Sequence, residues 1–169
     1  MKRIFLLIFF SNFTLSELIL EITQGTEDPF RVAIIQFEGS NDIASDVHQI
    51  IKNNLKRSGE FTIFDNDDLL SIPNSESDII FNDFKILNID YLVIGNIIND
   101  NLNITSEYKV FDIKKSTKVR SSTIFGIPNK NRQLAHYISD GIYEEITGIK
   151  GIASTKILYV TENEDFKLI

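Results

Sequence analysis

The sequence predicts one α/β domain, built on a mixed sheet of about five to six strands with two to three helices. Apolar, strand-like runs alternate with amphipathic helical segments, which is typical of the α/β class. Three consecutive strand-like runs near the middle are separated only by short turns, which indicates an antiparallel meander. A chain of 169 residues that is 43% hydrophobic and 24% charged can also enclose a core of ordinary size.

The first sixteen residues have the pattern of a secretory signal peptide. Lys2 and Arg3 form a positive start, and Ile4 to Phe10 is a short apolar run. Thr14 and Ser16 place small residues before a cleavage point at Glu17. The alternative is a buried first strand or helix. The apolar run is too short to span a bilayer, and no later run is longer, so we expect no transmembrane segment after cleavage.

Two strands are expected at the start of the mature chain. Leu18 to Ile22 is a short apolar run, and Gly25 with the Asp28-Pro29 turn ends it. Arg31 to Phe37 is the second strand. Its apolar residues from Val32 to Ile35 are continuous, which predicts burial on both faces, as in a central strand.

The first helix is predicted from Asp42, as its cap, to Gly59, which ends it. Lys56 and Arg57 in the last turn suit the negative end of the helix dipole. Apolar residues recur at offsets of 4, 7, 8 and 12 along one helical face: Ile43, Val47, Ile50, Ile51 and Leu55.

A short strand at Phe61 to Phe64 follows, and residues 65–77 are polar enough to predict a loop. A short helix is expected over Ile79 to Leu87. Its inward side chains are predicted to be Ile79, Ile80, Phe84 and Leu87.

The predicted meander comprises Tyr91 to Ile98, Leu102 to Asp112 and Thr117 to Phe125. Apolar and polar residues alternate in the second of these strands, which indicates a sheet with one wet face. A last helix ends at Gly148, and a strand at Lys156 to Val160 follows it. The helix has one apolar face: Leu134, Ala135, Ile138, Ile142 and Ile146.

Composition argues against several classes of site. A net charge of −7 disfavours a nucleic-acid partner, and zero cysteines exclude disulfides and thiolate metal sites. His48 and His136 lie on different helices and lack the spacing of a metal motif. The Asp65-Asn66-Asp67 run begins like a calcium loop but lacks the glycine and glutamate that such a loop needs. No metal is expected.

Catalytic and cofactor motifs are also missing. The Thr147 to Gly151 stretch follows a helix where a phosphate-binding loop would open one, so we read it as a helix end and turn. His136, Ser139 and Asp140 could suggest a triad, but residues on one helix cannot build an oxyanion hole. We interpret them as hydrogen-bonding groups on the helix surface. No catalytic residue and no cofactor is therefore predicted.

The start of the mature chain suits recognition. Leu18, Leu20 and Ile22 alternate in an exposed, strand-forming segment. Such a segment can lie along its own domain or add to the sheet edge of a partner. Composition alone favours the self-docked arrangement, because free apolar strands aggregate.

Several short stretches of the sequence, in their order and spacing, resemble the TolB amino-terminal domain family. The resemblance covers roughly residues 17–160. The matching stretches are Leu20 to Gly25, Val32 to Phe37, Asn54 to Phe61, Asn88 to Gly95, Tyr108 to Asp112 and Arg132 to Val160. Gln36 stands where that family usually has proline, a change that we expect to be tolerated.

The resemblance implies a non-enzymatic, anticodon-binding-type α/β domain at residues 17–155, after a signal peptide at 1–16. Residues 156–169 would then begin a truncated β-propeller. It further implies a TolA-binding segment, by position, and no Pal binding without the propeller. The implied TolA-binding residues are Glu17, Leu18, Ile19, Leu20, Glu21, Ile22, Thr23, Gln24, Gly25 and Thr26.

We therefore expect a periplasmic binding module of a Tol–Pal-like system in a Gram-negative envelope. Its expected role is protein–protein contact that supports outer-membrane integrity, cell division and protein transport. One alternative is an envelope-associated module that binds lipid or peptidoglycan without Tol partners. Another is a small hydrolase that uses His136 and Ser139.

Overall fold

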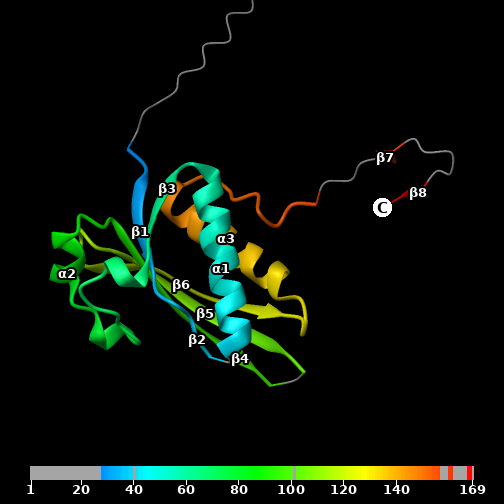
Figure 1. Cartoon of the computed structure of the whole chain (residues 1–169), viewed down its shortest axis with the longest axis horizontal. Helices are drawn as coiled ribbons and strands as arrows, with labels where there is room; N and C mark the ends of the chain where they lie inside the picture. The colour runs from blue at the N-terminus through cyan, green and yellow to red at the C-terminus, as the bar shows by residue number, and fades with distance from the viewer. Residues whose placement is uncertain (1–27, 40, 101, 157–159, 162–166, 169) are drawn as a thin grey trace, which may run out of the picture.

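The computed structural model describes residues 28–39, 41–100, 102–156, 160–161 and 167–168. These residues form a mixed six-stranded sheet with three α-helices (Figure 1), as the sequence predicted. The helices are α1 (Asn41–Ser58), α2 (Phe81–Ile86) and α3 (Asn131–Thr147). The strands of this sheet are β1 (Phe30–Ile34), β2 (Glu38–Gly39), β3 (Phe61–Phe64), β4 (Tyr91–Asn99), β5 (Ile104–Asp112) and β6 (Thr117–Gly126).

The strand order is β3-β1-β4-β5-β6, and β2 pairs in parallel with β4. β1 lies between β3 and β4 and is parallel to both. β4, β5 and β6 form the antiparallel meander that the sequence predicted. A two-stranded pair of β7 (Val160–Thr161) and β8 (Lys167–Leu168) is separate from this sheet.

The sheet carries a core on each face. α1 and α3 cover one face, where Val32 and Ile34 of β1 pack. Phe84 of α2 packs on the opposite face, together with Ala33 and Ile35. Figure 1 shows α1 and α3 together and α2 on the other side. The continuous apolar run in the second expected strand is therefore buried on both faces, as predicted.

The two long helices follow their predicted apolar faces. Val47, Ile51 and Leu55 of α1 are buried, as is the predicted face of α3, whereas Ile43 and Ile50 of α1 are half-buried. Gly148 ends α3 with φ = 72°, a left-handed conformation that glycine adopts without a steric penalty. The start of α1 differs from the prediction. The helix begins at Asn41, so Asp42 lies in its first turn and does not cap it.

Two expected elements are shorter than the sequence suggested. The strand expected at Arg31 to Phe37 ends at Ile34, and the chain then bends into β2. α2 begins at Phe81, so Ile79 and Ile80 precede it and Ile80 is exposed. An apolar run without helix start signals does not fix its own boundary, so tertiary packing decides it.

Candidate functional site

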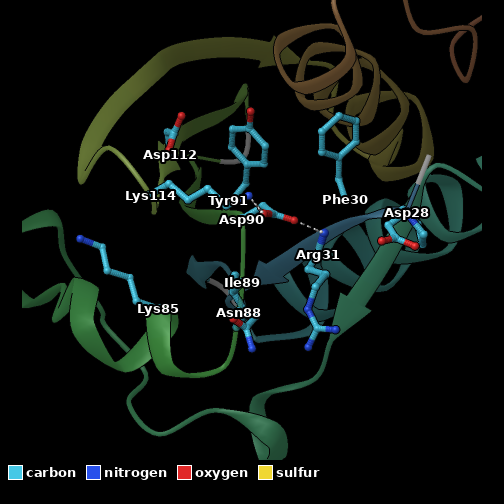
Figure 2. Close-up of a pocket in the computed structure, with 11 residues that line it drawn as sticks. Asp28, Phe30, Arg31, Lys85, Asn88, Ile89, Asp90, Tyr91, Asp112 and Lys114 are labelled. Carbon is cyan, nitrogen blue, oxygen red and sulfur yellow. Dashed lines mark hydrogen bonds and ion pairs between the residues drawn. The ribbon is translucent and has the colours of Figure 1, made fainter.

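The expected TolA-binding segment from Glu17 to Thr26, with its Leu18 to Ile22 strand, lies outside the described residues. The described chain begins at Asp28, and this residue lines a cavity of about 670 Å³. Figure 2 shows Asp28 and Phe30 at the start of β1, Lys85 and Asn88 toward α2, and Tyr91 with Lys114 across the cavity. This cavity therefore lies where the described chain begins.

Asp90 holds the two central parallel strands together beside the cavity. Its carboxylate accepts a hydrogen bond from the backbone N–H of Arg31 at 3.0 Å, and its own N–H donates to the Arg31 carbonyl at 2.7 Å. The second carboxylate oxygen pairs with Lys114 Nζ at 2.7 Å. The Asp90 carbonyl accepts the N–H of Ile113 at 2.9 Å. One residue therefore ties the start of β1 to the meander.

The side chain of Arg31 fixes the other wall. Its Nη2 donates to the carbonyl of Leu87 at 3.0 Å, and the guanidinium lies 4.8 Å from the centre of the Phe64 ring. A cation over an aromatic face is attracted by the ring quadrupole. The side chain of Arg31 therefore links the start of β1 to β3 and to the end of α2.

Aromatic rings pack where β1 begins. Phe30 lies 6.1 Å from Phe61 and 6.0 Å from Tyr91, measured between ring centres. Such tilted and edge-on pairs stabilise beyond the area that they bury. β1 therefore begins at a cluster of the three rings of Phe30, Phe61 and Tyr91, which we call the aromatic platform.

Two carboxylates at this cavity pair with lysines, Asp90 with Lys114 and Asp112 with Lys115. Burial, and then the nearby Asp112, raise the pKa of Tyr91. The hydrogen bond and charge of Asp90 raise the pKa of Lys114. Burial acts to raise the pKa of Asp112, but hydrogen bonds from Lys115 outweigh it and lower that pKa.

His136 and Ser139 do not form a catalytic pair. Asn54 Nδ2 on α1 lies 2.9 Å from His136 Nδ1 and donates to Ser139 Oγ at 2.9 Å. The hydroxyl of Ser139 in turn donates to the Ala135 carbonyl at 2.7 Å, and this serine is buried. These groups join α3 to α1, whereas we expected hydrogen bonds on the helix surface. Sequence spacing could not identify Asn54, because it comes from a different helix.

Asp140 fixes the chain after α3. Its carboxylate oxygens accept the backbone N–H groups of Ala153 at 2.7 Å and Ser154 at 2.9 Å. Gly151 lies so close that a Cβ there would be 2.5 Å from the Asp140 Cα. Sequence analysis missed this contact, because a lone aspartate on a helix gives no sign of what it holds.

Neither a metal-binding cluster nor a membrane-spanning helix is found in the described part of the chain. Within these residues, no group of three or more His, Cys, Asp or Glu side chains converges. Asp65 of the calcium-like run pairs with Lys52 instead. No described helix is both long and apolar enough to cross a bilayer.

Comparison with known proteins gives one family. The model of the TolB amino-terminal domain matches residues 18–119. The Tol-Pal system protein TolB of Alcanivorax borkumensis is 38% identical over 149 residues, and that of Pseudomonas aeruginosa is 34% identical over 144. These alignments cover 88% and 84% of this chain, but only 34% and 33% of the relatives.

A solved structure gives the same result. The crystal structure of TolB from Acinetobacter baumannii matches with a TM-score of 0.70 at 28% identity. The match covers 81% of this chain and 33% of that one. The chain thus spans about a third of the length of the TolB proteins that it matches.

Proposed function

Because this chain belongs to the TolB amino-terminal domain family, we propose that it is a protein-binding module of a Tol–Pal system. We place it in the periplasm, where it supports outer-membrane integrity, cell division and protein transport without catalysis. The family assignment supports this role, since the relatives are Tol-Pal system proteins. Residues 1–16 are proposed to be a signal peptide, 17–155 the binding domain and 156–169 the start of a propeller.

The proposed binding element is the segment from Glu17 to Thr26, and its partner is a TolA-like inner-membrane protein. One observation carries this proposal, namely that the segment ends two residues before Asp28, which leads into the aromatic platform of β1. The segment alternates Leu18, Leu20 and Ile22, so it can add as a strand to the edge of a partner sheet. Backbone hydrogen bonds would then give affinity, and the alternating side chains would give register.

Isothermal titration calorimetry with the C-terminal domain of the cognate TolA tests this proposal. Deleting residues 17–26 should abolish binding while leaving the far-UV circular dichroism and thermal midpoint of the domain unchanged. Leu20→Pro should weaken binding strongly, because proline removes a strand hydrogen-bond donor. Leu20→Val, which keeps an apolar strand-forming side chain, is the matched control. Unchanged binding after the deletion would refute the assignment.

A hydrolase is not favoured by the described geometry. Ser139 is buried and its hydroxyl donates to the Ala135 carbonyl, so it presents no nucleophile to a substrate. His136 contacts Asn54, and no hydrogen bond links it to Ser139. The protein-binding role therefore stands as the single proposal.

A further inference from the structure

β6 is an edge strand in the sheet that the described residues form. It pairs with β5 on one side, and no described strand lies on the other. It has ten residues, and its burial alternates between exposed and half-buried from Val119 onward. An edge of this length presents a row of backbone groups to which another strand can pair.

The first half of β6 has the features that usually protect an edge. Lys118 pairs with Glu76 at 3.0 Å, and Arg120 pairs with Glu145 at 3.4 Å. The pairing with β5 also shifts register at Val110/Phe111, which leaves Val119 without an opposite residue. Charges and a bulge of this kind oppose the addition of a further strand.

The second half of β6 has neither feature. The run from Ser121 to Ile127, which continues one residue past the end of β6, holds no charged residue and no proline. Its large side chains are open to solvent, since Phe125 is 77% exposed and Ile127 57%. Phe125 pairs with Thr105 of β5, and Thr105 pairs with Ile98 of β4, so the three side chains lie on the same face of the sheet. Ile98 is 61% exposed. An uncharged edge beside exposed apolar side chains favours strand addition.

We propose that this half of β6 pairs antiparallel with the same strand of a second copy, about a two-fold axis at Ile124. An axis there pairs each of the seven uncharged residues with another residue of the same seven in the second copy. Ser121 then faces Ile127, and Thr123 faces Phe125. Aromatic and β-branched residues form favourable cross-strand pairs. No charged residue lies inside the paired run, and Arg120 next to it faces the uncharged Pro128. Lys118 and Lys130 would face each other only two residues further out. The dimer is thus isologous and closed, as two-fold interfaces are.

The groove next to β6 provides room for the partner on the helix side. It has a volume of about 180 Å³ and is lined by Gly126, Leu134 and Tyr137, among others. Tyr137 of α3 is 45% exposed. Ile124 faces this layer, since it packs against the core that α1 and α3 cover. The two copies of Ile124 would therefore meet on the side of the sheet that α1 and α3 cover.

Sedimentation velocity of the purified chain tests the dimer. A dimer whose fraction rises with protein concentration is expected. Thr123→Lys should abolish it, because the two-fold axis brings the new charge close to its symmetry mate. The matched control is Thr62→Lys on β3, the opposite edge of the sheet, which should leave the dimer unchanged. A chain that is monomeric at every concentration would overturn the proposal.

Disulfide trapping tests the axis itself, because the chain has no native cysteine. Ile124→Cys should cross-link to its mate, since paired Cα atoms about 5 Å apart match disulfide geometry. Ser122→Cys lies on the same face and is also half-buried, but it would be about 13 Å from its mate and should not cross-link. Equal cross-linking at both positions would contradict the axis. If β6 amides were protected from hydrogen exchange in a monomer, a segment of the same chain would occupy the edge, and the proposal would be wrong.

Discussion

At the scale of single residues, α3 and β5 approach each other closely at Gly141. A Cβ added at Gly141 would collide with the hydroxyl of Tyr108. That hydroxyl is buried and has no hydrogen-bond partner among the described residues. The glycine is therefore required by the tyrosine beneath it.

Gly141→Ala should lower the free energy of unfolding by about 1–3 kcal/mol, because overpacking forces side chains and backbone to shift. Tyr108→Phe alone should cost little, since its hydroxyl makes no hydrogen bond. Combining the two changes should recover part of the loss. Urea denaturation of the two single variants and the double variant measures this coupling. Additive losses would show that the tyrosine hydroxyl is not the obstacle.

His48 gives the domain a dependence on pH. Burial, and then the charge of Lys52, lower its pKa from 6.5 to about 4. The unfolded chain therefore binds more protons than the folded chain between these values, so stability falls as pH drops from 6.5 toward 4. Below that pH range, the contribution of His48 to stability no longer changes.

Between pH 7 and pH 5, His48 should contribute a loss of about 1 kcal/mol, a figure reduced for its partial exposure to solvent. His48→Gln removes the titrating group and should flatten this part of the pH profile. Urea midpoints at the two pH values measure the difference, and His136→Gln serves as a comparison. An equal slope in wild type and His48→Gln would contradict the assignment.

At the scale of elements, α3 and the chain after it depend on each other through Asp140. Its carboxylate accepts two backbone N–H groups from the following loop. Carboxylates that accept such bonds stabilise more than neutral acceptors do. Sequence analysis placed α3 and its end correctly, but it could not identify this contact.

Asp140→Ala should speed amide hydrogen exchange at Ala153 and Ser154, with a loss of about 1–3 kcal/mol in local stability. Asp140→Asn keeps one oxygen acceptor and should have a smaller effect. Exchange measured by NMR at these two amides, relative to amides in the middle of α1, gives the result. Unchanged exchange in Asp140→Ala would mean that other contacts hold the loop.

At the scale of the whole molecule, the two faces of the sheet are unequally covered. α1 and α3 are long and pack against one continuous core. α2 has six residues, and Phe84 is its only buried side chain. A helix this short is not stable alone, so its structure depends on packing against the sheet. Phe84 supplies the buried ring, and the half-buried Phe81 packs beside it against Phe111.

Phe84→Ala should cost about 3–5 kcal/mol, the usual range for removing a buried ring. The loss should appear first as unfolding near α2, while β1 and α1 remain protected. Hydrogen exchange resolved by residue separates the two regions. Val47→Ala in the opposite core is the comparison, and it should lower protection across the whole domain. Uniform loss of protection in Phe84→Ala would contradict a separate α2 layer.

The sequence determined the fold class, the meander, both long helices and the family, because hydrophobic period and helix end signals are local properties of the chain. Only the tertiary structure decided which distant residues meet. The link from Asp90 to Arg31, the bonds from Asn54 to His136 and Ser139, and the contact between Gly141 and Tyr108 each join different segments. Their side chains approach because the sheet order and helix packing bring those segments together, and periodicity along one segment carries no record of its neighbour.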